Sequence, residues 1–538
     1  MTLDQQAAIR RAHQHGVGDI LRRSAQRTPD KTAIVCGDVQ WSYRDFDQIC
    51  DRLVAALSQQ GIAAGDRVAI LSRNSHAFAA MRFALARMGA VLVPINFMLN
   101  AGEVAYILRS SGARTLLVGA GFEALAVDAI AAAERGTGDG QHAGVQIGLQ
   151  IWLPSEDQAD GAPEGMLRFD DLLMASAPAP DIAPVDPRAL LQIIYTSGTE
   201  SLPKGAMLSH EAVLWEYVTC IVEGNMQADD VVLHALPLYH CAQLDVFLGP
   251  AVYLGATNII TGQPRPDVIL PLIARHRVNA FFAPPSIWIA LLRSPLFDGA
   301  DLASLAKGYY GASIMPVEVL KEMQRRMPAV RLWNFYGQTE IAPLATVLHP
   351  DDQLRKAGSA GKPALNVETR IVDVEMRDVA PGEVGEIVHR SPQLLDGYYN
   401  DPERTAEAFR GGWFHSGDLA VRDDEGYITI VDRKKDMIKS GGENVASREV
   451  EEMIFRIPEV SEVAVIGLPD AYWVEAVTAV IVLKEGRSLS EQQVIDFCKA
   501  GMAHFKVPKR VIFAEALPKN PSGKLLKREL RRRYEAPR

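Results

Sequence analysis

Two patterns of apolar and polar positions alternate through the first third of the chain, one typical of buried strands and one typical of helices. Short apolar runs rich in β-branched and aliphatic residues predict buried strands at residues 32–36, 67–71, 90–94 and 115–118. Between these runs, residues 43–59 and 77–88 carry apolar positions at helical spacing. Strands that alternate with helices in this way predict an α/β fold of layered helices on a mostly parallel sheet.

The pattern repeats once and then changes. Between about residues 210 and 345 the alternation of strands and helices returns, with strands predicted at 279–283 and 330–334. From about residue 365 to residue 432, shorter runs separated by Gly and Pro predict a small β-rich subdomain. Beyond residue 432 the sequence predicts a small α+β unit, with helices at 447–455 and 490–502 and strands at 460–468 and 476–483.

The main domain boundary is expected at the run Asp432-Arg-Lys-Lys-Asp436, in which every residue is charged. A chain of 538 residues is too long for a single hydrophobic core, so several domains or subdomains are expected. We predict an N-terminal domain at residues 1–431, a hinge at 432–435 and a C-terminal domain at 436–538.

Composition and charge narrow the possible partners. The residues are 48% hydrophobic and 23% charged, which is typical of a globular enzyme, and the net charge of −10 disfavours nucleic acid and anionic membranes. Neither a secretory signal nor a run of about 18 apolar residues is found, so we expect a cytoplasmic protein without integral membrane association. The five cysteines are scattered without a C-x-x-C pair and are expected to be free thiols: Cys36, Cys50, Cys220, Cys241 and Cys498.

One loop carries the clearest chemical signal. Tyr195-Thr-Ser-Gly-Thr-Glu-Ser-Leu-Pro-Lys-Gly205 lies between a β-type run and a helix-like stretch. Small residues let backbone N–H groups approach phosphate oxygens closely, and Lys204 adds a positive charge. On composition alone, an ordinary polar turn is the commoner interpretation. The loop is not a Walker A motif, because G-K-[ST] is missing.

Further segments follow in a fixed order and together cover nearly the whole chain. They are Gly311-Ala-Ser313, Tyr336-Gly-Gln-Thr-Glu340, Trp413-Phe-His-Ser-Gly-Asp-Leu419, Asp432 to Asn444, and Asn520-Pro-Ser-Gly-Lys524. With the loop at 196–205, they resemble the adenylate-forming (ANL) superfamily of acyl-CoA synthetases, luciferases and peptide-synthetase adenylation domains. The resemblance implies a ligase of the fatty-acyl-CoA synthetase type. Such an enzyme uses ATP and Mg²⁺ to convert a carboxylic acid to an acyl-adenylate and then transfers the acyl group to coenzyme A.

The resemblance also implies where the nucleotide and metal bind. Thr196 and Glu340 would hold Mg²⁺, Asp418 would accept hydrogen bonds from the ribose hydroxyls, and Arg433 would contact the nucleotide. The complete expected nucleotide site comprises Thr196, Ser197, Gly198, Thr199, Gly311, Ala312, Ser313, Asn334, Tyr336, Gly337, Thr339, Asp418 and Arg433.

The resemblance assigns the remaining roles to the two steps of the reaction. The path of the CoA thiol arm is expected along Lys439, Ser440, Gly441 and Gly442. A small, mobile C-terminal domain would rotate about Lys435 between the two steps, removing Lys524 from the site after adenylation. The expected catalytic residues are Lys524, Lys204, His240 and Lys435.

The segment Leu236-Pro-Leu-Tyr-His-Cys-Ala-Gln243 resembles the family segment beside the acyl pocket, and the resemblance implies that His240 lies next to the substrate carboxylate. His240 would orient the carboxylate, although a purely structural histidine is an equal alternative. The small Cys241 and Ala242 and the apolar residues 246–248 suit an aliphatic chain, so we expect a medium- to long-chain fatty acid. An aryl or arylpropenoic acid is the runner-up, with Tyr239 and Trp288 available to stack on its ring.

Other functions stay open at this stage. An acyl-AMP ligase that loads a carrier protein would share the motifs, and a non-catalytic nucleotide or acyl-CoA binding protein is a rival of a different class. The expected partners are a small carboxylic acid, ATP and CoA, with no nucleic acid, and a homodimer is left open.

Two segments depart from the family pattern. Glu200-Ser201 stands where many relatives have Thr-Gly, and Val474 stands at a glycine position within Pro469-Asp-Ala-Tyr-Trp-Val-Glu475. A carboxylate that faced the phosphates would repel them, so Glu200 is expected to face solvent or a cation.

Overall fold

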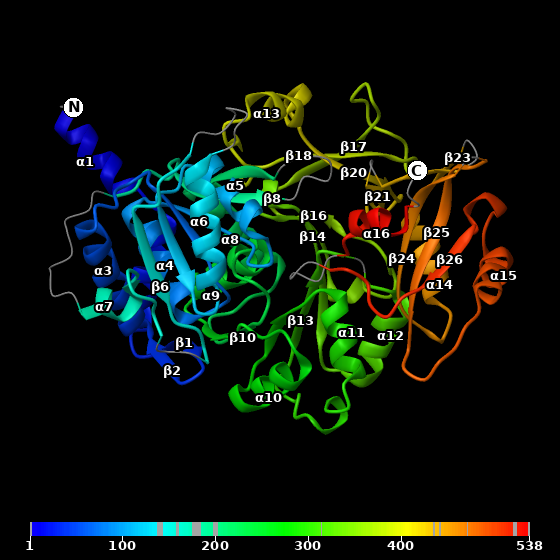
Figure 1. Cartoon of the computed structure of the whole chain (residues 1–538), viewed down its shortest axis with the longest axis horizontal. Coiled ribbons are helices and arrows are strands. Elements are labelled where there is room, and N and C mark those ends of the chain that lie inside the picture. Colours follow the sequence, from blue (N-terminus) through cyan, green and yellow to red (C-terminus); the bar gives the residue numbers. More distant parts are fainter. Residues whose placement is uncertain are drawn as a thin grey trace.

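Four β-sheets organise the part of the chain that the structure describes, with nine, eight, four and five strands. In this computed structural model (Figure 1) the C-terminal elements, coloured orange to red, lie at the opposite end of the molecule from the blue N-terminal elements. The structure describes residues 3–136, 144–157, 161–174, 184–196, 203–313, 315–433, 436–440, 443–470, 472–519 and 525–535.

The eight-stranded sheet is parallel except at one edge, where β9 pairs antiparallel with β8 and β19 with β9. Its order is β19-β9-β8-β4-β3-β5-β6-β7. The strands are β3 (Arg67–Leu71), β4 (Val91–Pro94), β5 (Thr115–Gly119), β6 (Leu149–Leu153), β7 (Leu167–Arg168), β8 (Leu190–Thr196), β9 (Lys204–Ser209) and β19 (Gly397–Tyr398).

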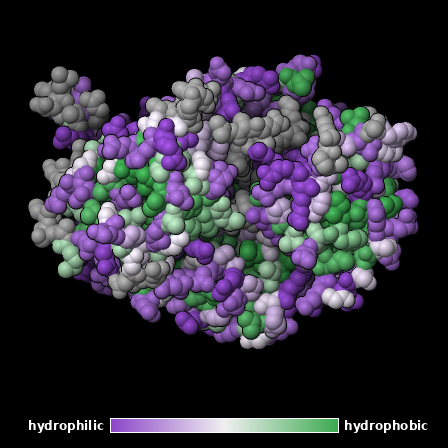
Figure 2. All heavy atoms as spheres, viewed as in Figure 1, coloured by the Kyte–Doolittle hydropathy of each residue, from purple (hydrophilic) through white to green (hydrophobic). Residues whose placement is uncertain are grey.

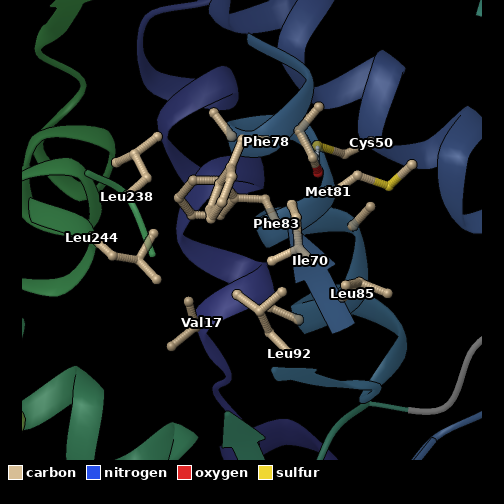
Figure 3. Packing of buried hydrophobic residues seen from close by; sticks show 14 of the residues in the cluster. Val17, Cys50, Ile70, Phe78, Met81, Phe83, Leu85, Leu92, Leu238 and Leu244 are labelled. Carbon is tan, nitrogen blue, oxygen red and sulfur yellow. Dashed lines mark hydrogen bonds between the residues drawn. The ribbon is translucent and has the colours of Figure 1, made fainter. Parts of the chain in front are cut away.

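Alternate residues of these strands enter two separate cores, as the period of a strand requires. Val68 and Ile70 of β3 face one core, and Ala69 and Leu71 face the other. Figure 3 shows the first core, where Phe78 and Phe83 pack beside Ile70. This core contains α2 (Val17–Arg27), α3 (Tyr43–Gln59) and α4 (His76–Met88), and the other contains α5 (Ala101–Ser111) and α6 (Glu123–Arg135).

The nine-stranded sheet has a parallel centre, β1-β11-β10-β12-β13-β14, and antiparallel edges formed by β2 and by β15 with β16. The strands are β1 (Thr32–Cys36), β2 (Val39–Ser42), β10 (Val231–His234), β11 (Thr257–Ile260), β12 (Ala280–Phe282), β13 (Lys307–Gly311), β14 (Arg331–Gly337), β15 (Leu344–Leu348) and β16 (Lys362–Pro363).

Helices cover both faces of the nine-stranded sheet. One face packs against α8 (His210–Glu223), the π-helix η1 (Ala242–Leu248) and α9 (Gly249–Leu254). The other packs against α10 (Pro266–His276), α11 (Pro285–Arg293) and α12 (Val317–Arg326).

The four-stranded sheet is antiparallel and contains β17 (Glu368–Val372), β18 (Gly385–Arg390), β20 (Phe414–Arg422) and β21 (Ile428–Arg433). It corresponds to the predicted β-rich subdomain, with one difference. The segment between β18 and β20 leaves this sheet, because β19 pairs with β9 of the eight-stranded sheet and is followed by α13 (Pro402–Ala408).

The C-terminal unit is built on the five-stranded sheet, with strands β22 (Ile438–Ser440), β23 (Glu443–Val445), β24 (Val460–Asp470), β25 (Val474–Leu483) and β26 (Arg510–Phe513). Its helices are α14 (Ser447–Phe455), α15 (Glu491–Gly501) and α16 (Lys527–Tyr534). Hydrophilic residues gather over α16 in Figure 2, and this helix is fixed by ion pairs of Lys527 with Glu451 and of Arg531 with Asp436.

The predicted α/β fold with a separate C-terminal domain is confirmed, and the helices at residues 43–59 and 447–455 match α3 and α14. The exact domain limits stay a prediction: β21 continues to Arg433, beyond the expected boundary at residue 431. Within the described ranges, no helix is long and apolar enough to cross a membrane.

A buried ion pair joins the helices of the two large sheets. Arg82 of α4 and Asp245 of η1 are 2.9 Å apart and have side-chain exposures of 1% and 0%. Gln192 of β8 donates to the other carboxylate oxygen of Asp245 at 2.7 Å. Burial raises the pKa of Asp245 above its ordinary value, although the Arg82 guanidinium opposes this shift.

We predict that Arg82→Ala lowers the free energy of unfolding by about 3–5 kcal/mol, because Asp245 is left buried and unpaired. Urea unfolding followed by fluorescence measures the change. Arg44→Ala is the matched control, since its pair with Asp30 is exposed, and it should change stability by less than about 1 kcal/mol. The double variant Arg82→Met with Asp245→Leu should recover most of the loss. Equal effects of Arg82→Ala and Arg44→Ala would contradict the structural role of the buried pair.

Candidate active site

The site lies where the parallel strands of the nine-stranded sheet end. β13 ends at Gly311 and β14 at Gly337, and such carboxyl ends are where α/β sheets bind ligands. A Cβ on Gly311 would lie 2.4 Å from the carbonyl oxygen of Phe335, so a larger residue does not fit. Ala312 follows with a left-handed φ of 64°, and both Ala312 and Ser313 are exposed. The predicted segment 311–313 therefore lines an open edge.

The two ends of the predicted phosphate loop are adjacent across a hairpin. Thr196 ends β8 and Lys204 begins β9, and the two residues are register partners. The Thr196 hydroxyl donates to the Lys204 carbonyl at 3.5 Å. Both residues are only partly buried, so their side chains are accessible from the site.

Lys204 lies beside Glu340. Its ammonium is 3.4 Å from Oε1 of Glu340, which lies in the short helix η3 (Thr339–Ile341) and is almost buried. Tyr398 of β19 completes the group: Lys204 Nζ donates to its hydroxyl at 2.6 Å, and that hydroxyl donates to Glu340 at 3.0 Å. A cation, a carboxylate and a phenol from three separate segments thus converge.

Asp418 forms a second polar group with two other predicted residues. The Tyr336 hydroxyl donates to its Oδ2 at 2.7 Å, and the Arg433 guanidinium is 3.4 Å from its Oδ1. Burial, together with the adjacent Asp418 carboxylate, raises the pKa of Tyr336 well above its ordinary value, so the phenol stays protonated. The ends of β14 and β21 meet the middle of β20 here.

The predicted acyl segment lies close to the same edge. The His240 ring accepts a hydrogen bond at Nδ1 from the backbone N–H of Ala242, at 3.1 Å. The next residue, Cys241, is buried, and its sulfur is 3.3 Å from the hydroxyl of Thr339. This contact joins η1 to the segment that carries Glu340. Burial raises the pKa of the Cys241 thiol well above its ordinary value, which makes it an unreactive side chain.

Other predicted residues have mainly structural contacts. The Asn334 amide donates to the carbonyl of Ser359 at 2.9 Å and is largely buried. In the C-terminal domain Lys439 is exposed, and its backbone N–H donates to Glu475 at 2.6 Å. Ser440 is buried on β22. The remaining candidates lie outside the described residues: Ser197, Gly198, Thr199, Lys435, Gly441, Gly442 and Lys524, together with Glu200 and Ser201.

Sequence reasoning missed Tyr398. It belongs to the segment Gly397-Tyr-Tyr-Asn400, about 58 residues after Glu340 and 194 after Lys204. A short tyrosine-containing turn carries no general chemical signal, and only the pairing of β19 with β9 brings it to the site.

The donor set is consistent with a magnesium–nucleotide complex. In the part of the chain that the structure describes, no group of three or more His, Cys, Asp or Glu residues is arranged to hold a metal. Mg²⁺ is commonly bound through one or two carboxylates together with substrate phosphates and water, and Glu340 offers one such carboxylate. A hydroxyl at Thr196 adds a second hard oxygen at the same edge.

The layered fold and this site define an adenylate-forming ligase. Residues 21–399 match the family model described as AMP-binding enzyme, and residues 449–524 match the AMP-binding enzyme C-terminal domain. The chain therefore belongs to the AMP-binding enzyme family, and it is an acyl-CoA ligase that works through an acyl-adenylate. ATP, Mg²⁺ and coenzyme A, expected from the sequence, are the cofactors of this class.

The relatives act on different acids. Indoleacetate–CoA ligase of Aromatoleum aromaticum is 36% identical over 510 residues, 95% of this chain and 96% of the relative. Long-chain-fatty-acid–CoA ligase FadD13 of Mycobacterium tuberculosis is 37% identical over 524 residues, 97% of this chain and 99% of the relative. The crystal structure of the anthranilate CoA ligase AuaEII with anthranoyl-AMP matches with a TM-score of 0.88 at 26% identity, covering 97% of this chain and 98% of that one.

Val474, where the sequence departs from the expected motif, is in a strained backbone conformation. Its φ is 69°, in the left-handed region that β-branched residues rarely adopt. Its side chain is 66% exposed, so little burial compensates for the strain. Ser440 is its register partner on β22, which places the strain beside the predicted CoA path.

We predict that Val474→Gly stabilises the C-terminal domain by roughly 0.5–1 kcal/mol. Relief of about 1–2 kcal/mol of left-handed strain exceeds the entropic penalty of about 0.5–1 kcal/mol for glycine. Differential scanning calorimetry measures the shift. Val474→Ala keeps the Cβ and should not stabilise, so a gain in both variants would show that backbone strain is not the cause.

Proposed function

We propose that this acyl-CoA ligase acts on a compact apolar carboxylic acid, with an aryl or arylpropenoic acid as the best fit. The observation that carries this proposal is a stack of aromatic rings beneath the site. Phe247 of η1 stacks on Phe282 at a ring-centroid distance of 4.6 Å and on Phe335 at 6.1 Å. Tyr309 and Trp333 extend the cluster, with centroids 5.2 Å apart.

The aromatic cluster limits the depth available to an acyl group. A tail that passed between η1 and the sheet would meet the rings of Phe247, Phe282 and Phe335, all nearly fully buried. Beyond Phe247 there is a cavity of only about 10 Å³, lined also by Met226, Leu254 and Tyr309, which is room for about one water molecule. A flat aromatic ring at the mouth would stack on this wall without displacing it.

A medium- to long-chain fatty acid, the expectation from the sequence, is the second candidate. Movement of the Phe247 ring would admit such a chain, because the space that the ring now fills would be added to the small cavity behind it. The likeness to the long-chain-fatty-acid–CoA ligase FadD13 points the same way. Phe247 therefore separates the two candidates.

The polar groups of the site suggest a separate role for each residue in adenylation. Lys204 would neutralise charge on the phosphates, Glu340 and Thr196 would hold Mg²⁺, and Asp418 would bind the ribose with Tyr336 fixing its orientation. His240 lies at the start of η1, where it would orient the carboxylate of the acid. Mg²⁺, when bound, supplies Lewis-acid charge neutralisation. Positioning and charge stabilisation therefore account for most of what these residues would do.

Lys524 would bridge the acid carboxylate and the α-phosphate during adenylation, and a rotated C-terminal domain would then present Lys439 and Ser440 to CoA. These roles follow from the resemblance of residues 520–524 and 432–444 to the family motifs.

We predict that the purified protein releases AMP with ATP, Mg²⁺, CoA and an aryl acid, and that activity falls steeply for linear acids beyond short chains. Phe247→Ala should move the optimum to longer chains, because it joins the cavity to the site. Leu248→Ala is the matched control, since Leu248 faces the other core. An optimum on long chains in the wild type would favour the fatty-acid candidate, and acyl-AMP that CoA does not consume would indicate a carrier protein.

We predict that Lys524→Ala abolishes acid-dependent ATP–pyrophosphate exchange but retains thioester formation from supplied acyl-AMP. The lysine charge is needed only while negative charge develops between carboxylate and α-phosphate. Lys519→Ala is the matched control, because Lys519 lies shortly before Lys524 in the chain and is paired with Glu462. This variant should retain both reactions. Equal loss of both reactions in Lys524→Ala would contradict the two-state mechanism.

A further inference from the structure

Tyr398 lies between Lys204 and Glu340, which would bind groups of opposite charge in the proposed function. Lys204 would face the phosphate anion and Glu340 the metal cation. The Tyr398 hydroxyl accepts from Lys204 Nζ at 2.6 Å and donates to Glu340 Oε1 at 3.0 Å. A hydroxyl has one donor and two acceptor positions, so it can bind the ammonium and the carboxylate at the same time.

The backbone fixes Tyr398 independently of its hydroxyl. β19 pairs with β9 so that Tyr398 is opposite Ala206, and Lys204 projects from the same face because side chains alternate along a strand. The Tyr398 N–H donates to the hydroxyl of Thr405 at 2.9 Å. The Lys204 ammonium lies 4.1 Å from the centre of the Tyr398 ring. A phenylalanine would keep all these contacts and lose only the hydroxyl.

The environment keeps this hydroxyl neutral. Tyr398 is only 4% exposed. Burial and the adjacent Glu340 carboxylate raise the pKa of Tyr398 far above its ordinary value. The neutral phenol therefore keeps the proton that it donates to Glu340.

We propose that Tyr398 is a positioning residue that holds Lys204 and Glu340 apart, so that both charges stay available for a magnesium–nucleotide complex. This inference rests on the proposed function. Lys204 and Glu340 are already 3.4 Å apart. This ion pair is longer than the roughly 2.7–2.9 Å of a charge-assisted hydrogen bond. Without the hydroxyl, the ammonium and carboxylate close into a directly hydrogen-bonded ion pair that satisfies both charges. A bound nucleotide must then separate this pair before Lys204 can face phosphate and Glu340 the metal.

The test is the affinity of Tyr398→Phe for MgATP, measured by calorimetry without acid or CoA. We expect the dissociation constant to rise about tenfold, the effect of one hydrogen bond to a charged group. The dissociation constant of AMP should not change, because AMP carries neither the terminal phosphates nor the metal. Tyr399→Phe is the matched control: Tyr399 packs against the core on the α5–α6 side of the eight-stranded sheet, and MgATP affinity should stay at the wild-type value.

Two results would overturn the inference. One is wild-type MgATP affinity in Tyr398→Phe. The other is a parallel loss of MgATP and AMP affinity with a lower melting temperature, which would assign the hydroxyl a general structural role. The proposed function is tested separately by acid-dependent pyrophosphate exchange of the wild type. If every acid failed there, the proposed function would be rejected, and the binding measurement would still decide the role of Tyr398.

Discussion

The buried pair of Arg82 and Asp245 is the constraint on which the arrangement of the two large sheets depends. Burying either charge alone would cost several kcal/mol of desolvation. The helix α4, which carries Arg82, and the helix η1, which carries Asp245, must therefore pack at the distance that lets the two charges pair. Gln192 adds β8 to the same contact. β8 continues to Thr196 at the phosphate end of the site, and η1 follows His240 at the acyl end. One interaction far from solvent therefore fixes the spacing between the two ends of the active site.

Each polar group of the site joins elements of different sheets. Lys204 belongs to the eight-stranded sheet and Glu340 follows the last parallel strand of the nine-stranded sheet. Tyr336 ends that strand, and its partner Asp418 belongs to the four-stranded sheet. The site therefore forms only when three sheets are docked. The buried pair of Arg82 and Asp245, which holds the two large sheets together, therefore also supports the site.

Local pattern and family motifs predicted different parts of this structure. Periodicity located α3 and α14 to the residue, because amphipathic spacing is a property of each segment. It did not predict that β1 and β2 pair within the nine-stranded sheet, whereas β3, the next strand along the chain, belongs to the eight-stranded sheet. Strand partners are set by contacts between residues far apart in the sequence. In the same way, Asp245 is visible as a charge in an apolar run, but its partner lies 163 residues away. The motifs singled out Lys204, Glu340 and Asp418, whose roles stay a prediction, whereas the place of Tyr398 follows only from the strand pairing.

A partly buried arginine makes a different kind of contact between the C-terminal domain and the rest of the chain. Arg448 of α14 donates to the carbonyls of Gly358 and Ile430, and among the ion pairs of the described residues none includes it. Burial lowers the pKa of Arg448 to about 10, although nearby acidic side chains oppose this shift. Carbonyl groups that lose such a partner can bind water, whereas a buried carboxylate that loses its cation cannot. The Arg82 contact is therefore suited to permanent docking, and the Arg448 contact to an interface that separates between the two proposed reaction steps.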